Sequence, residues 1–178
     1  WTSAISFVAS ANCAKYCGAK IEFLDIDKDT YNLDVKKLED KLKISKKKKS
    51  LPKIIIPVHL GGNPCDMEKI HLLSKKYKFK VIEDASHALG SKIKKSKIGS
   101  CKYSDLTVFS FHPVKMITTA EGGVVTTNNK SLASKLKIFR EHGIVRDKKK
   151  FLFKKNLETY YEQQSLGYNY RMSELHAS

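Results

Sequence analysis

Long apolar runs are missing from this sequence of 178 residues. A helix that crosses a bilayer needs about 20 consecutive, mostly apolar residues, and no stretch of the sequence provides them. A basic start followed by a short apolar run, the pattern of a secretory signal, is missing as well. The sequence therefore gives no indication of a membrane protein, and we expect no membrane partner.

Cysteine is scarce, and none of the 4 cysteines belongs to a C-x-x-C pair. Cys13 and Cys17 share a stretch with helical character, but no His-x-His motif accompanies them, so the ligand spacing typical of a zinc site is absent. A disulfide framework is not indicated either, because such frameworks are typical of small secreted chains. We expect free thiols in a reducing cytoplasm and no metal site.

Acidic residues are few, since 18 Asp and Glu stand against 34 Lys and Arg and leave a net charge of +16. Two interpretations compete: a surface that neutralises nucleic-acid phosphates, and a solvated lysine-rich surface that attracts small anions. Arginine, which reads guanine edges, is rare, and the lysines gather in short runs at 46–49, 92–97 and 148–150. We favour the solvated surface and expect no nucleic-acid partner; a basic module that binds nucleic acid or an anionic surface is the alternative.

What the sequence does have is an alternation of strand-like and helix-like segments. Short apolar runs indicate strands buried on both faces, and apolar residues at helical spacing indicate helices between them. This alternation predicts an α/β fold with a mainly parallel sheet and helices on both faces. The expected strands are 20–24, 54–60, 81–83, 106–111 and 123–127, and the expected helices are 8–16, 34–43, 67–77, one from 131 and one from 173.

Unusual segments follow the ends of these predicted strands: 83–87 (EDASH), 110–115 (SFHPVK) and 118–123 (TTAEGG). In open α/β sheets, ligands bind beyond the carboxyl ends of the strands. Asp84 comes directly after an apolar strand, where a carboxylate is costly to bury without a cationic partner. It is either the N-cap of a following helix or a carboxylate that keeps a heterocyclic nitrogen protonated, as an electron-sink cofactor requires.

Ser110 and Lys115 follow the next predicted strand. Most lysines of this chain are surface charges, but Lys115 comes after an aromatic strand and Pro113, and before paired glycines that let backbone pass close to a ligand. A lysine among apolar neighbours can act as a nucleophile towards an aldehyde. The Ser110 hydroxyl is suited to a phosphate oxygen, and its alternative role is in a strand-end turn.

Together these segments resemble the DegT/StrS family of sugar aminotransferases. The resemblance covers essentially the whole chain, and the run 112–123 is most similar to the transaminases of the pseudaminic-acid pathway. It implies the large domain of a fold-type I transferase that depends on pyridoxal 5′-phosphate. The matching segments are 2–12, 57–62 (PVHLGG), 83–90 (EDASHALG), 109–115 (FSFHPVK), 119–123 (TAEGG) and 167–174 (GYNYRMSE).

By this resemblance each candidate residue has an implied role. Lys115 would hold the cofactor covalently and move the proton, Asp84 would pair with the pyridine nitrogen, and Ser110 would bind the cofactor phosphate. Phe7 would stack on the pyridine ring. His87 would lie close to the ring, with a satisfied structural histidine as the alternative.

The resemblance also bears on the extent of the chain and on its partners. The sequence begins at Trp1 without an initiator methionine, and we expect residues 1–178 to be the central part of the large domain. The family's upstream phosphate loop and carboxy-terminal small domain would then lie outside it. Asn169 would reach the cofactor phosphate of a neighbouring subunit, which predicts a homodimer with a shared active site.

The implied reaction is amination of C4 of a UDP-linked 4-keto-6-deoxy-N-acetylhexosamine, with glutamate as the expected amino donor. Two alternatives remain within the family. One is an aminotransferase for another nucleotide-linked sugar, and the other is a dehydratase variant of the same fold. Lys115 argues against the dehydratase, because that branch has lost the lysine.

Overall fold

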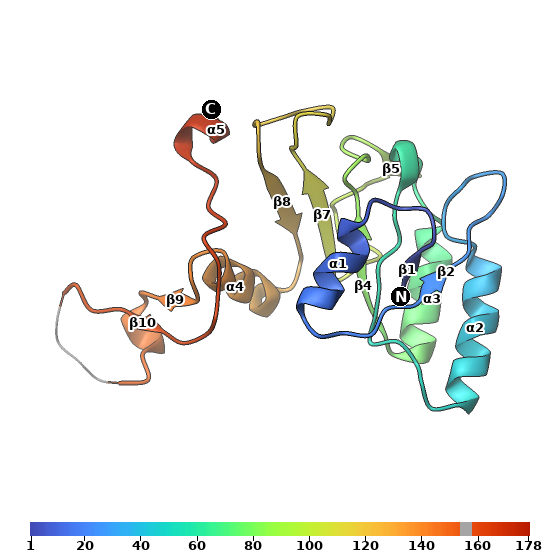
Figure 1. Ribbon diagram of the computed structural model, residues 1–178, viewed down its shortest axis with the longest axis horizontal. Helices are drawn as coiled ribbons and strands as arrows, with labels where there is room; N and C mark the ends of the chain where they lie inside the picture. Colours follow the sequence, from blue (N-terminus) through green and yellow to red (C-terminus); the bar gives the residue numbers. More distant parts are fainter. Residues whose placement is uncertain (154–157) are drawn as a thin grey trace. The chain divides into compact units, whose positions relative to one another are not determined.

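The computed structural model describes residues 1–153 and 158–178 (Figure 1). The chain divides into two compact units, Trp1–Asn128 and Asn129–Ser178. The first unit contains the sheet and the ends of its strands, and the second is smaller. No helix in the described part of the chain is long and apolar enough to cross a membrane.

The first unit is built on a four-stranded sheet with the order β3-β4-β7-β8. The first three strands pair in parallel, and β8 runs antiparallel to β7. This confirms the α/β fold class with a mainly parallel sheet. The strand β8 reverses because residues 111–122 contain no crossover helix, which a parallel connection needs. The strands are β3 (Ile54–Ile55), β4 (Lys80–Asp84), β7 (Leu106–Ser110) and β8 (Gly123–Thr126).

A parallel pair, β1 (Thr2–Ser3) and β2 (Phe23–Leu24), lies beside β3. A parallel bridge between Thr2 and Ile56 connects the pair to the sheet. The observed strand β3 is much shorter than the predicted strand 54–60. Pro57 has no N–H to donate to a neighbouring strand, and the backbone then turns through the 3-10 helix η1 (Leu60–Gly62).

The helices of this unit begin where the sequence provides caps. Asp34 accepts hydrogen bonds from two backbone N–H groups at the start of α2 (Val35–Lys47), and Asp66 accepts one at the start of α3 (Met67–Tyr77). The helix α1 (Ala9–Tyr16) has no side-chain cap. These three helices agree with the sequence prediction, except that α2 extends beyond residue 43.

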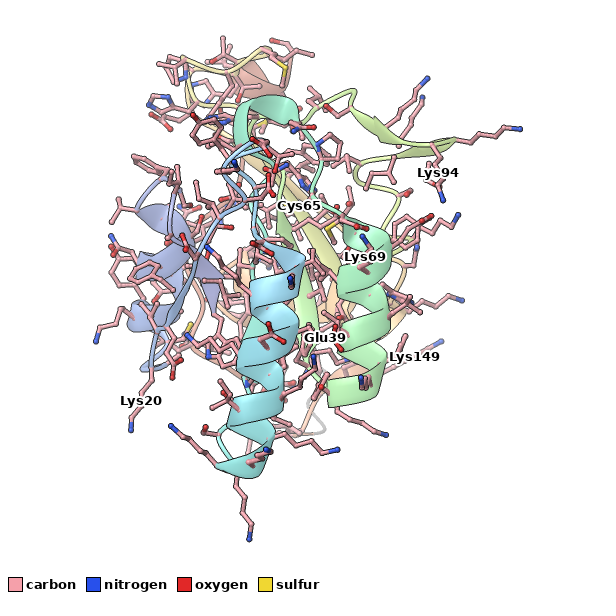
Figure 2. The ribbon with its side chains drawn as sticks, turned by 90° about the vertical axis from the view of Figure 1, so that its right-hand side faces the viewer. Lys20, Glu39, Cys65, Lys69, Lys94 and Lys149 are labelled. Carbon is pink, nitrogen blue, oxygen red and sulfur yellow. The ribbon has the colours of Figure 1, made fainter. Side chains whose placement is uncertain are left out.

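The hydrophobic core lies between α2, α3 and one face of the sheet (Figure 2). Ile55 and Val81 are paired neighbours on β3 and β4, and both are buried on this face. Outward-facing lysines such as Lys20 and Lys94 point away from the ribbon in Figure 2. The buried core residues are Leu24, Leu33, Leu38, Leu42, Ile55, Cys65, Met67, Ile70, Leu73, Tyr77, Phe79 and Val81.

The lysine-rich stretch 92–97 forms an antiparallel hairpin of β5 (Lys92–Ile93) and β6 (Ser96–Lys97), which the sequence did not predict. Its lysines are solvated, and Lys94 forms an ion pair of 2.7 Å with Glu68. The segment is too short and contains too few apolar residues for an alternating pattern to indicate a strand.

The second unit contains α4 (Lys130–Phe139), the antiparallel strands β9 (Ile144–Val145) and β10 (Glu162–Gln163), the 3-10 helix η2 (Lys148–Lys150) and α5 (Glu174–Ala177). The predicted helices from 131 and 173 are both present. Gly143 has a φ of 74°, and a Cβ there would lie 1.7 Å from the carbonyl oxygen of Ser165. No other residue fits at this turn after α4.

Candidate active site

The predicted site residues of the first unit lie around the carboxyl ends of β4 and β7. Asp84 is the last residue of β4, and Ser110 is the last residue of β7. In the register of these strands Asp84 pairs with Val108. Side chains alternate along a strand, so Ser110, two residues after Val108, projects from the same face of the sheet as Asp84. This face is the opposite one from the α2–α3 core.

The Asp84 carboxylate is held by three hydrogen bonds. Its Oδ1 accepts from the backbone N–H of Ser86 at 3.1 Å and from the Ser86 hydroxyl at 2.7 Å. Its Oδ2 accepts from the Ser10 hydroxyl. The residues after Asp84 form turns, not a helix, so the helix-cap interpretation of Asp84 is wrong.

Helix α1 is attached to the sheet through this contact. Ser10 lies in its first turn and is buried, whereas Phe7, which precedes the helix, is 75% exposed. The hydrogen bond from Ser10 to Asp84 therefore puts α1 on the face of the sheet that α2 and α3 leave open. Phe7 precedes Ser10 by three residues, and its ring is accessible.

Lys115 lies in the loop that joins β7 to β8 and is half-buried. The base of the loop is closed by a hydrogen bond from the Phe111 N–H to the Gly122 carbonyl at 2.8 Å. The Thr119 N–H donates to the Phe111 carbonyl at 3.0 Å, and the Lys115 N–H donates to the His112 carbonyl at 2.9 Å. These bonds hold the loop, with Lys115, beyond the strand end that carries Ser110.

His87 and Asn169 complete the predicted set. His87 is exposed on the turn after β4, and this turn packs closely on Gly62, where a Cβ would lie 2.7 Å from the His87 carbonyl oxygen. Asn169 belongs to the second unit and forms an antiparallel bridge with Glu141. The first unit thus contains Phe7, Asp84, His87, Ser110 and Lys115, and the second contains Asn169.

A buried polar pair behind Asp84 escaped the sequence analysis. Glu83 and His59 are 3% and 0% exposed, and the His59 Nε2 lies 2.8 Å from a carboxylate oxygen of Glu83. The Cys65 N–H donates to the His59 Nδ1 at 3.1 Å, so Nδ1 carries no proton and Nε2 is the donor to Glu83. The one signal in the sequence for this buried pair was Glu83, a charged residue inside an apolar strand.

The pKa of Glu83 reflects this network. Burial alone raises the pKa of a carboxyl group, but hydrogen bonds from His59, Ser104 and Thr107 outweigh it and hold the pKa of Glu83 below its ordinary value. With a lowered pKa in the folded state, Glu83 contributes stability above the ordinary carboxyl pKa. That contribution is lost as the pH falls through the lowered pKa. The pair thus secures the end of β4 at neutral pH.

The model of the DegT/DnrJ/EryC1/StrS aminotransferase family matches residues 1–178. The chain belongs to this family. It is 48% identical over 174 residues to the UDP-4-amino-4,6-dideoxy-N-acetyl-beta-L-altrosamine transaminase of Campylobacter jejuni, a match that covers 98% of this chain and 42% of that enzyme. The chain thus spans less than half the length of this relative.

Solved structures of the family agree with the fold. PseC of Helicobacter pylori, an aminotransferase involved in pseudaminic-acid biosynthesis, is 35% identical with a TM-score of 0.82, over 99% of this chain and 43% of that one. The sugar aminotransferase Spr1654 of Streptococcus pneumoniae, solved in a PLP form, is 28% identical with a TM-score of 0.78, over 99% and 45%. The predictions of the family and of pyridoxal phosphate as its cofactor are confirmed.

The residues at the strand ends fit this cofactor by their chemistry. Both Asp84 oxygens accept hydrogen bonds, and Oδ2, with a single donor, can also accept one from a ring N–H. Lys115 supplies a primary amine for an aldehyde, and Ser110 supplies a hydroxyl for a phosphate. The exposed ring of Phe7 offers an apolar face on the same side of the sheet.

Proposed function

We propose that this chain is part of an aminotransferase that converts a UDP-linked 4-keto-6-deoxy-N-acetylhexosamine to its 4-amino sugar. Pyridoxal phosphate is the cofactor, and glutamate is the amino donor. The observation that carries the proposal is the position of Asp84 at the end of β4 and of Lys115 in the loop after the neighbouring strand β7, in a chain 48% identical to the Campylobacter transaminase.

Each residue of the site has a distinct task in this proposal. Bound pyridoxal phosphate supplies an aldehyde and an electron-withdrawing ring. Lys115 holds the cofactor through Nζ, and once released it moves a proton as general base and acid. Asp84 keeps the ring nitrogen protonated. Ser110 donates a hydrogen bond to the phosphate, and Phe7 covers one face of the ring.

The wider architecture is part of the same proposal. Residues 1–178 form the central part of the cofactor-binding large domain, with a phosphate loop before it and a small domain after it. His87 lies near the cofactor ring. All four cysteines are free, as in proteins of a reducing compartment, and we place the enzyme in the cytoplasm. The nucleotide sugar and the amino donor are its partners, with the net charge of +16 attracting the anionic nucleotide.

The substrate is tested with the full-length enzyme. We expect a glutamate-dependent conversion of the UDP-linked 4-keto sugar, measured as the appearance of the amino sugar by mass spectrometry. The same 4-keto-6-deoxy sugar linked to GDP or to dTDP serves as the control. A preference for one of these would replace the UDP assignment, and amination of none of them would overturn the proposed function.

We further propose that the enzyme is a homodimer in which Asn169 of one subunit completes the site of the other. Inactive Lys115→Ala protein mixed with an inactive Asn169→Ala variant should then regain part of its activity. One site of each heterodimer would carry both intact residues. Subunit exchange is checked by native mass spectrometry. Exchange without recovered activity, or a monomeric active enzyme, would contradict the shared site.

A further inference from the structure

The hydrogen bonds around Asp84 distinguish its two oxygens. A carboxylate oxygen has two lone-pair positions. Ser86 donates twice to Oδ1, once from its backbone N–H and once from its hydroxyl. Ser10 donates once to Oδ2. Among the described residues no further donor reaches Oδ2, so this oxygen keeps one position for an outside N–H donor.

Ser10 is itself held by a second hydroxyl. The Ser6 hydroxyl lies 2.8 Å from the Ser10 hydroxyl. Because Ser10 donates its only hydroxyl proton to Asp84, it accepts from Ser6, whose hydroxyl proton is shared with the Phe7 carbonyl at 3.0 Å. The direction of the chain is therefore Ser6 to Ser10 to Asp84, and each bond polarises the next. The relay starts in the segment that carries Phe7 and ends on β4, and its last bond joins residues 74 apart in sequence.

The packing leaves Ser10 few other roles. Ser10 is 6% exposed in the first turn of α1, so its hydroxyl is placed by the helix and not by solvent. A buried hydroxyl without a partner is costly. The bond to Asp84 satisfies it and at the same time fixes the carboxylate. The Ser10 hydroxyl donates to Oδ2, the oxygen with the open position. It therefore influences the hydrogen bond that Oδ2 would make with an outside donor.

From this geometry we propose that Ser10 is a positioning residue that keeps the proton on the cofactor nitrogen. The inference rests on the proposed function. Oδ2 of Asp84 receives the ring N–H at its open position, and the Ser10 hydroxyl bonds the same oxygen. A hydrogen bond to a carboxylate stabilises its charged form. The donated bond occupies one lone-pair position of Oδ2 and leaves the other for the ring N–H, so the shared proton stays on the ring nitrogen.

The test is the protonation of the bound cofactor in the full-length enzyme, measured by 15N NMR with cofactor labelled at the ring nitrogen. In Ser10→Ala we expect the nitrogen signal to move towards that of the unprotonated ring. We also expect the dissociation constant of the cofactor to rise about tenfold, the size expected when a hydrogen bond to a charged group is lost. Ser10→Thr keeps the hydroxyl and should restore both values.

Ser74→Ala is the matched control, because the buried Ser74 hydroxyl donates only to the His71 carbonyl of its own helix, at 2.8 Å. It should leave the nitrogen signal unchanged. A Ser10→Ala enzyme with the wild-type signal would overturn the inference, as would a Ser10→Thr enzyme that behaves like Ser10→Ala.

Ser6→Ala decides the matter if Ser10→Ala does not fold. It removes the bond that polarises Ser10, together with the contact between the Ser6 hydroxyl and the Phe7 carbonyl, so we expect a smaller shift of the nitrogen signal in the same direction. An unmoved signal in that variant would overturn the inference. A wild-type enzyme that takes up no cofactor would overturn the proposed function as well, whereas bound cofactor with unmoved signals contradicts Ser10 alone.

Discussion

Replacing Lys115 with alanine is expected to abolish transamination and to leave the cofactor without a covalent attachment. The variant loses the amine that binds the aldehyde and also the group that moves the proton. General acid–base catalysis alone contributes roughly 10²- to 10⁴-fold to the rate. Turnover is measured as amino-sugar formation, and the attachment is measured by borohydride reduction followed by peptide mapping.

The matched control for this lysine is Lys97→Ala. Lys97 is exposed on the β5–β6 hairpin of the same unit, so the variant removes one positive charge without touching the loop between β7 and β8. We expect its activity and its labelled peptide to equal those of the wild type. Label on a lysine other than Lys115 in the wild-type enzyme would show that the assignment is wrong.

For Asp84→Asn we expect retained cofactor binding and a fall in kcat of about 10²- to 10³-fold, the range found when a preorganised electrostatic partner is removed. The amide has nearly the shape of the carboxylate, and its oxygen can still accept from Ser86. Its nitrogen, however, carries hydrogens, so it meets the cofactor nitrogen as a donor and favours the unprotonated ring. Steady-state kinetics and the absorption spectrum of the bound cofactor measure the two effects.

Asp34→Asn provides the control for Asp84→Asn. Asp34 caps α2 by accepting from the N–H groups of Lys36 and Lys37, and asparagine caps helices equally well. The control removes one negative charge at the start of α2, which contributes none of the proposed site residues, and should leave kcat unchanged. Near-normal turnover in Asp84→Asn would mean that Asp84 is a structural residue of the turn after β4.

Several features of this protein could be predicted because their signals are local. The apolar stripe of α3 and its cap at Asp66 follow from helical spacing and from backbone N–H groups that need an acceptor. The short apolar run of β4 follows from burial on both faces. The order of elements along the chain, together with the tendency of α/β proteins to bind ligands at the ends of strands, was enough to predict the site residues Asp84, Ser110 and Lys115.

Other features depend on which strands become neighbours. The sequence did not indicate that Glu83 would face His59 across 24 residues of chain, or that the two would share a network with Cys65. Nor did the sequence analysis indicate that Gly123 on β8 would pair with Ser110 on β7. Strand register decides these contacts, and register is a property of the assembled sheet.

Asp84 shows most clearly what the sequence determined and what only the tertiary structure decided. The local pattern determined that a carboxylate would lie at the end of a buried strand. The resemblance to the family then implied that this carboxylate contacts a cofactor. Only the tertiary structure decided how that carboxylate is held, because its donor Ser10 comes from a helix 74 residues away in sequence. The periodicity of a sequence specifies which face of an element is apolar. It does not specify which polar group of a distant element will satisfy a buried oxygen, since that depends on how the helix packs on the sheet.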